Sequence, residues 1–306
     1  MKERTRKTKV NENKGEGKQK QQRRTNLKSW GFILPSLLGV LVFFVIPFIV
    51  VIYYAMINNP VQKEFVFLDN IIRVFGNGAF RRAAGNTLKF SFTAVPLAVI
   101  LSLALAALLE RKMPWKSQFR TFFLTPMMVP VASIVLIFQV MFHYNGAFND
   151  LLGMFGVDKI DWLKSDHAMF VITILFLWKN LGYNMIIFMA ALASMPKDLI
   201  EVARLESATG WQIFFQIKLR YLSPTIMFVT LLSLINSFKI FREVYLLTGD
   251  YPYESLYMLQ HYMNNMFASL DYQKLSAAAI IMSIVMVVII GVLFLIENHF
   301  GKDVEE

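Results

Sequence analysis

The side chains that could do chemistry in this 306-residue sequence lie inside long apolar stretches rather than in catalytic motifs. Lys179, Asn180 and Asn184 fall in one such stretch, and Ser233 and Asn236 fall in another. Because Ser233 and Asn236 are three positions apart, they share one face of a helix. Polar groups at bilayer depth are costly, which makes each of them a candidate functional group. The chemistry that they offer is hydrogen bonding to a solute.

Lys179 is the most demanding of these side chains, because the middle of no other apolar stretch holds a carboxylate to pair with it. We therefore expect its ammonium group to face a water-filled cavity or a partner subunit. Lys239, Arg242 and Glu243 are expected near the outer end of their stretch, about 24 to 29 Å along a helix that starts at Ser223. At that depth the side chains can reach the membrane interface at little cost.

Covalent and metal catalysis have no visible basis in the sequence. It contains no cysteine, and its four histidines lack metal-ligand spacing: His143, His167, His261 and His299. Paired carboxylates, a Gly-x-Ser-x-Gly elbow and a His-Glu-x-x-His motif are absent. The phosphate-binding loop Gly-x-x-x-x-Gly-Lys-Ser/Thr is also absent, so the chain does not hydrolyse ATP by that route. We predict that the chain is not an enzyme and binds neither a metal nor a cofactor.

Six apolar segments must position the polar groups: residues 32–56, 88–109, 121–142, 168–192, 223–246 and 275–296. Each segment is long enough, as a helix of about 33–37 Å, to cross a hydrocarbon core of about 30 Å. The composition agrees, with 56% hydrophobic and 17% charged residues, against about 45–50% and about 25% in soluble domains. The sequence predicts an all-α polytopic membrane protein with six transmembrane helices in a domain of residues 30–296.

The basic residues set the expected orientation. The loops on one side of the six segments hold 20 Lys and Arg residues and the loops on the other side hold 6, which predicts that both termini are cytoplasmic. Residues 1–29 are expected to be a disordered basic tail and residues 297–306 a short C-terminal tail. No aromatic residue interleaves the charges of the first tail, so we assign it to topology and to anionic lipid rather than to nucleic acid.

The loop of residues 194–222, between the fourth and fifth segments, carries more pattern than the other loops. Lys197 to Glu206 is predicted to be a short amphipathic helix, followed by a break at residues 207–209. Thr209 and Gln212 have the spacing of a capping box, which predicts a second helix that runs toward the fifth segment. The pattern leaves two alternatives open: a docking element for a partner protein, or an interfacial helix that lies on lipid headgroups.

The motif Glu201-Val-Ala203-x-x-x-Ser207, followed after nine residues by Ile217-x-Leu219, resembles the cytoplasmic signature of permease subunits of binding-protein-dependent ATP-binding-cassette (ABC) importers. That signature reads Glu-Ala-Ala, three residues, Gly, nine residues, Ile-x-Leu-Pro. This sequence departs from it at three positions: Val202, Ser207 and Arg220. The segments Trp30–Pro35, Asn86–Leu88 and Phe238–Phe241 are similar to the carbohydrate branch of the family, of the maltose-transporter type, and most similar to the first of its two permeases.

The resemblance implies a division of labour in the inner (cytoplasmic) membrane of a prokaryote. A second, homologous permease would complete a heterodimer, a cytoplasmic ABC ATPase dimer would hydrolyse ATP, and an extracytoplasmic solute-binding protein would deliver the cargo. The loop would hold a coupling helix that docks on the ATPase, with Glu201 as the charged contact, Ala203 permitting close approach and Leu205 as an apolar contact. The coupling residues expected from the motif are Glu201, Ala203, Leu205, Ser207, Gly210, Ile217 and Leu219.

The resemblance also implies a sugar or oligosaccharide as the cargo. A path for pyranose rings needs amides and hydroxyls beside aromatic faces, and the candidates for it are Trp178, Lys179, Tyr183, Asn184, Ser233, Asn236 and Phe238. Two alternatives remain: the same architecture with another solute, such as glycerol phosphate, and a single-chain secondary transporter. The second alternative predicts internal repeats, which we do not find between the first three and the last three segments.

Overall fold

The computed structural model describes residue 31, residues 33–110 and residues 113–300. The predicted basic tail of residues 1–29 lies outside the described residues, and the cytoplasmic placement of both termini stays a prediction. Within the described residues, five helices are long and apolar enough to cross a membrane. They are Ile33–Ala55, Gly78–Glu110, Ala168–Ser194, Ser223–Thr248 and Tyr272–Asn298. The all-α membrane fold is confirmed.

The first of these spans contains a π-helical segment, η1 (Leu41–Val45), followed by α2 (Ile46–Ala55). The second span is the single helix α4 (Gly78–Glu110), which begins ten residues before the predicted segment. The extension is stable because the Asn77 side chain accepts hydrogen bonds from the N–H groups of Ala79 and Phe80, at 2.9 and 3.2 Å. Hydropathy marks only the part of a helix that lies in hydrocarbon, so the polar first turns of α4 were missed.

The third predicted segment is not one straight helix. The helices α5 (Lys116–Met128) and α6 (Val131–Met141) meet at an angle of 101°. The bend falls at Val129 and Pro130, both of which have extended backbone. Proline has no N–H for the helix ladder and disfavours helical geometry in the residue before it, which explains the break. Six spans result if the bent pair is counted as one.

The remaining spans are α8 (Ala168–Ser194), the pair α12 (Ser223–Phe238) and α13 (Phe241–Thr248), and α15 (Tyr272–Phe300). The break between α12 and α13 at Lys239 and Ile240 was not predicted. Short elements connect the spans: α3 (Asp69–Gly76), α7 (Ala147–Gly153), η3 (Glu254–Leu256) and α14 (Leu259–Ala268). The fourth connection holds α9 (Lys197–Leu205), α10 (Gly210–Gln212), the π-helical η2 (Ile213–Lys218) and α11 (Leu219–Tyr221).

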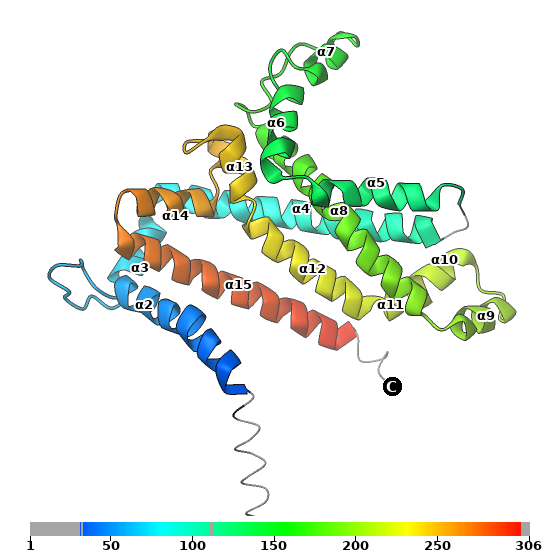
Figure 1. The fold of residues 1–306 in the computed structure, drawn as a ribbon, viewed down its shortest axis with the longest axis horizontal. Coiled ribbons are helices and arrows are strands. Elements are labelled where there is room, and N and C mark those ends of the chain that lie inside the picture. The colour runs from blue at the N-terminus through cyan, green and yellow to red at the C-terminus, as the bar shows by residue number, and fades with distance from the viewer. Residues whose placement is uncertain (1–30, 32, 111–112, 301–306) are drawn as a thin grey trace, which may run out of the picture.

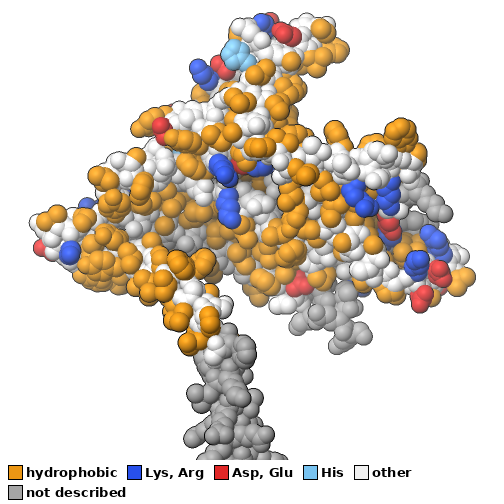
Figure 2. Space-filling view, viewed as in Figure 1, with side chains coloured by type: hydrophobic (Ala, Val, Ile, Leu, Met, Phe, Trp, Pro, Cys, Tyr) orange, Lys and Arg blue, Asp and Glu red, His pale blue; other side chains and the backbone are white. Residues whose placement is uncertain are grey.

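The spans form a bundle with distinct ends. In Figure 1, α3 and α14 lie at one end, α9 and α10 lie at the opposite end, and α6 with α7 projects from the side. The helix α4 packs along α8 and α12, and α15 packs against α2. Figure 2 shows hydrophobic side chains over most of one face of the bundle, as expected for a surface in contact with lipid.

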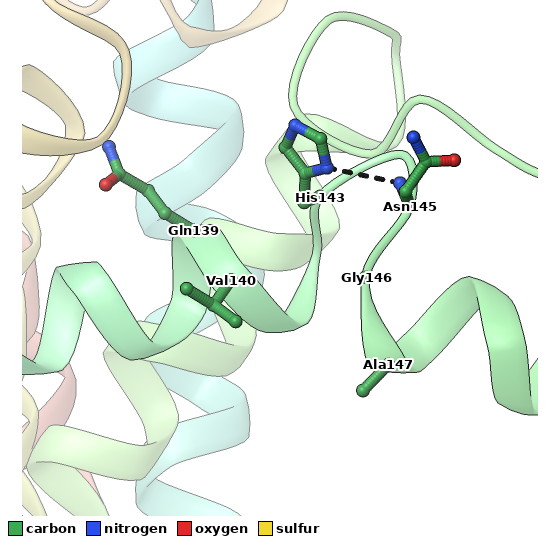
Figure 3. A pocket seen from close by; sticks show the side chains of 6 residues that line it. All are labelled: Gln139, Val140, His143, Asn145, Gly146 and Ala147. Atoms are coloured by element: carbon green, nitrogen blue, oxygen red, sulfur yellow. Dashed lines mark hydrogen bonds between the residues drawn. The ribbon is translucent and has the colours of Figure 1, made fainter.

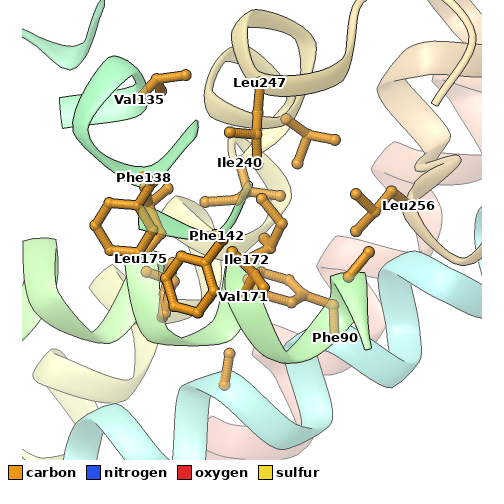
Figure 4. Packing of buried hydrophobic residues seen from close by; sticks show 14 of the residues in the cluster. Phe90, Val135, Phe138, Phe142, Val171, Ile172, Leu175, Ile240, Leu247 and Leu256 are labelled. Carbon is orange, nitrogen blue, oxygen red and sulfur yellow. The ribbon is translucent and has the colours of Figure 1, made fainter. Parts of the chain in front are cut away.

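Aromatic and aliphatic side chains close the centre of the bundle. One buried cluster joins Phe90 of α4, Phe138 of α6, Ile172 and Leu175 of α8, and Leu247 of α13 (Figure 4). A second cluster joins α4, α8 and α12 nearer the end that carries α9. In a bilayer such contacts stabilise the fold through packing rather than through exclusion of water, so small residues and close helix approaches matter.

Candidate translocation cavity and coupling surface

A cavity of about 320 Å³ lies where both helix breaks face α8. Val129 and Val131 contribute from the α5–α6 bend, and Ile240 contributes from the α12–α13 break. Breaks of this kind expose groups in the middle of a span to a protein cavity instead of to lipid. The polar lining consists of Lys179, Asn180, Tyr183, Asn236, Lys239 and Glu243.

Lys179 and Glu243 form an ion pair across this cavity. The expectation that Lys179 has no carboxylate at its depth was therefore wrong. Glu243 lies in the first turn of α13, directly after the break at Lys239 and Ile240, and meets Lys179 of α8 instead of reaching the membrane interface. The pair is largely enclosed, with 23% of the Lys179 side chain and 8% of the Glu243 side chain exposed.

Two amides form a second link across the cavity. Asn236 Nδ2 donates a hydrogen bond to Asn180 Oδ1 at 2.9 Å, and Asn180 Nδ2 donates to the carbonyl of Phe176 at 2.8 Å. The ion pair and the amide pair both join α8 to the α12–α13 segment. Both sides of the cavity therefore carry polar groups that can exchange their present partners for the hydroxyls of a solute.

The other predicted path residues lie away from the cavity. Asn184 Nδ2 donates to Ser233 Oγ at 2.9 Å, and both side chains are buried between α8 and α12. Phe238 is buried in the cluster of α4, α8 and α12, and Trp178 packs near Phe138. Of the predicted set, the structure brings Lys179, Tyr183 and Asn236 together. It adds Asn180, a polar candidate that was not assigned to the path, and Lys239 and Glu243, which were expected near the membrane interface.

A second cavity, of about 410 Å³, lies between α6 and α7. In Figure 3 the imidazole of His143 accepts a hydrogen bond from the N–H of Asn145, and Gln139 points to the other side of α6. Gln139 Nε2 donates to the carbonyl of Leu247 at 3.0 Å. Because Gln139 and His143 already have partners within the protein and no predicted path residue lines it, this cavity is the weaker candidate.

The loop of residues 194–222 has the predicted two-helix form. The capping box is confirmed, because the Gln212 N–H donates to Thr209 Oγ1 and the Thr209 N–H donates to Gln212 Oε1. Ser207 ends α9 with a φ of +62°, in the left-handed region that favours glycine. The Ala208 N–H donates to the carbonyl of Ala203 at 2.9 Å, which closes the helix as in a Schellman motif. This turn explains why the family signature has glycine where this chain has Ser207.

The coupling residues expected from the motif divide into exposed and enclosed groups. Glu201, Ser207 and Gly210 are exposed, and Leu205 is 86% exposed. Ala203 is buried in the packing of the loop itself, since α9 contacts η2. Ile217 and Leu219 are half-buried where the loop joins α12.

Trp211 and Phe215 were missed as site residues. Their rings stack at 5.7 Å between centroids, and Trp211 is 74% exposed. The signal was present in the sequence as two aromatic residues four positions apart, Trp211 within the capping box and Phe215 after it. Leu199, Val202 and Leu205 of the same loop are also exposed apolar side chains, and we call the five residues together the coupling surface. Charged side chains lie beside hydrophobic ones at this end of the bundle in Figure 2.

Comparison with known proteins identifies the architecture. Residues 94–306 match the family model described as the binding-protein-dependent transport system inner membrane component. The chain belongs to this family. It is therefore a multi-pass permease of the inner membrane and not itself catalytic, and a partner ATPase hydrolyses the ATP. A binding protein belongs to the same ABC transporter complex.

Relatives with transport functions cover nearly the whole permease. The trehalose/maltose transport system permease protein MalF of Thermococcus litoralis is 29% identical over 89% of this chain and 93% of that protein. The lactose transport system permease protein LacF of Rhizobium radiobacter is 26% identical over 91% of this chain and 95% of that protein. These similarities confirm the resemblance to the carbohydrate-uptake type of permease.

A solved structure supports the same fold. A chain of a bacterial ABC transporter involved in the import of the acidic polysaccharide alginate superposes with a TM-score of 0.77 and 21% identity. The match covers 92% of this permease and 98% of that chain. At this identity the likeness concerns the arrangement of helices and not the cargo.

Proposed function

We propose that this permease imports a sugar or an oligosaccharide, and that the cavity between α8, the α5–α6 bend and the α12–α13 break lines the path. The observation that carries the proposal is the polar lining at two helix breaks, where Lys179 pairs with Glu243 and Asn236 pairs with Asn180. Amides, charged groups and the phenol of Tyr183 suit the hydroxyl groups of a sugar. The names of the relatives point to the same class of cargo.

Half of the path is proposed to come from a second, homologous permease, so that the working unit is a heterodimer. An ATPase dimer would bind the loop of residues 194–222, and an extracytoplasmic binding protein would deliver the cargo at the end that carries α3 and α14. The exposed coupling surface supports this arrangement, because an apolar group beside Glu201 offers a partner both packing area and a charge. Residues 30–296 form the transmembrane unit of this proposal.

A phosphorylated solute is the second candidate. The sn-glycerol-3-phosphate transport system permease protein UgpA of Pectobacterium atrosepticum is 28% identical over 83% of this chain and 88% of that protein. Lys239 lines the cavity and has no ion-pair partner among the residues that the structure describes, so its ammonium group suits an anion.

Uptake by proteoliposomes that hold the permease, its second permease and its ATPase separates the candidates. With ATP supplied and the binding protein present, radiolabelled maltose, trehalose, lactose and glycerol 3-phosphate are tested in turn. We expect uptake of a sugar, and we expect Asn236→Ala to lower it at least about tenfold because the half-buried amide of Asn180 loses its partner and the cavity loses a hydrogen-bonding group for the solute. Asn145→Ala, in the second cavity, is the matched control. Uptake of glycerol 3-phosphate alone would favour the second candidate, and full uptake by Asn236→Ala would contradict the assigned path.

A further inference from the structure

The last residue of α4 is joined to the last residue of η2 by an ion pair. Lys218 Nζ lies 2.6 Å from Glu110 Oε1 and 2.5 Å from Glu110 Oε2. The two residues are 108 positions apart in the sequence. The pair is partly enclosed, since 16% of the Lys218 side chain and 34% of the Glu110 side chain are exposed. It connects the second span to the loop of residues 194–222.

The placement of Glu110 needs a reason, because a carboxylate at the C-terminus of a helix faces the negative end of the helix dipole. A cation on a neighbouring element removes this conflict, and Lys218 supplies it. An ion pair of this exposure adds little to stability in general. Its significance lies in the two elements that it connects.

The segment that ends at Lys218 is the irregular part of the loop. The helix η2 has π geometry over Ile213–Lys218, a form that is rare and occurs as short bulges at functional positions. It carries Phe215 of the coupling surface and leads through α11 into α12. Without a second attachment, a movement of α9 could be absorbed by deformation of η2 before it reached the spans.

The helix α4 is suited to receive such a movement. It packs along both α8 and α12, the two spans that continue directly into the loop and that also line the cavity. A tie from Lys218 to α4 therefore connects the loop, through α4, to two helices that line the cavity, α8 and α12. Packed helices move as units rather than deforming continuously, so the three would shift together.

We propose that the Glu110–Lys218 ion pair is a positioning element for energy coupling, which fixes η2 to α4 so that movement of the loop reaches the cavity. The inference rests on the proposed function, in which the loop docks on an ATPase. It goes further, because it gives the second span a role in coupling and assigns that role to Glu110 and to Lys218, whose residue type the family signature leaves open.

The test uses the purified complex with its second permease and ATPase, and a thiol reporter in the cavity. The chain has no cysteine, so Met127→Cys introduces one thiol into it at a cavity position that is 59% exposed. The rate of labelling by a methanethiosulfonate reagent is measured on this chain by mass spectrometry. It is compared between the nucleotide-free state and the state trapped with ATP and orthovanadate.

We expect trapping to change the labelling rate when the native pair is present. Glu110→Gln and Lys218→Gln should each shrink that change by about fivefold, which is the lower end of coupling between sites. The double variant Glu110→Lys with Lys218→Glu should restore it, which a merely structural role of either residue would not produce. Asp271→Asn, which removes a local ion pair with Lys274 at the start of α15, is the matched control and should leave the change intact.

The inference would be overturned if trapping changed the labelling rate of both single variants as much as that of the native protein. It would also be overturned if the double variant showed as small a change in labelling rate as the single variants. These results would not contradict the proposed function, because ATP hydrolysis would still change the accessibility of the cavity. The proposed function and the inference would both be contradicted if the ATPase did not purify with the permease. The same would follow if trapping left the labelling rate unchanged in the protein with the native ion pair.

Discussion

At the scale of single residues, the Lys179–Glu243 ion pair is the group whose disruption should have the largest effect on stability. Removing one partner leaves the other charge enclosed and unpaired, which costs a few kcal/mol. We expect Lys179→Met and Glu243→Gln each to lower the thermal unfolding midpoint of the detergent-purified permease, measured by tryptophan fluorescence. Lys239→Gln is the control, because Lys239 lines the same cavity without an ion-pair partner in the described part of the chain. An equal fall in the unfolding midpoint in all three variants would contradict a special role of the ion pair in stability.

His261 gives the fold a pH dependence. It lies in α14, outside the membrane-spanning helices, and burial lowers its pKa to about 4, opposed in part by the charge of Asp250. The unfolded chain therefore binds a proton near pH 6.5, while the folded chain does not until about pH 4. Stability should fall by about 1.4 kcal/mol per pH unit as the pH drops through this window.

The measurement is unfolding by denaturant at pH 7.5, 6.0 and 5.0. His261→Gln should remove the part of the slope of unfolding free energy against pH that His261 contributes. His143→Gln, which alters an exposed histidine, should leave that slope unchanged. A wild-type slope in the His261→Gln variant would show that another group carries the pH dependence.

At the scale of helices, the sequence predicted the positions of the spans and missed their breaks. Apolar length identified every span, because each must cover the hydrocarbon core. Pro130 was a visible signal for the bend between α5 and α6. The break at Lys239 and Ile240 had no proline to mark it, so Glu243 was expected too far from Lys179. The cavity depends on both breaks, which is why only part of its lining could be predicted.

The contact between α5 and α8 depends on Gly182. A Cβ atom at this position would overlap the backbone carbonyl of Phe123, and backbone cannot move aside as a flexible side chain can. We expect Gly182→Ala to separate α5 from α8, to lower the thermal unfolding midpoint and to alter the thiol labelling of a Met127→Cys reporter. Gly291→Ala on α15, where a Cβ would meet no atom within 4 Å, is the control. A midpoint equal to that of the control would mean that the helices adjust without cost.

At the scale of the whole molecule, the loop of residues 194–222 and the cavity lie at different places along the same helices. The helix α8 runs from the cavity into α9, and η2 returns through α11 into α12. The two-helix form of the loop was predictable because its capping box and its break are local features. Its exposed aromatic pair was recognisable as a surface only in three dimensions, because exposure depends on how α9 packs against η2.

Glu201 decides between the two interpretations of the loop that the sequence left open. If the coupling surface docks on an ATPase, Glu201→Lys places a like charge or an unpaired group in the interface and lowers substrate-stimulated ATP hydrolysis. If the loop lies on anionic headgroups, the added lysine strengthens that contact and hydrolysis is unchanged. The measurement is ATP hydrolysis by the reconstituted complex with and without loaded binding protein, after equal membrane insertion has been confirmed. Asp158→Lys, an exposed acidic residue between α7 and α8, is the matched charge reversal and should have no effect. Equal stimulation in the two variants would reject the docking of this loop on an ATPase through Glu201.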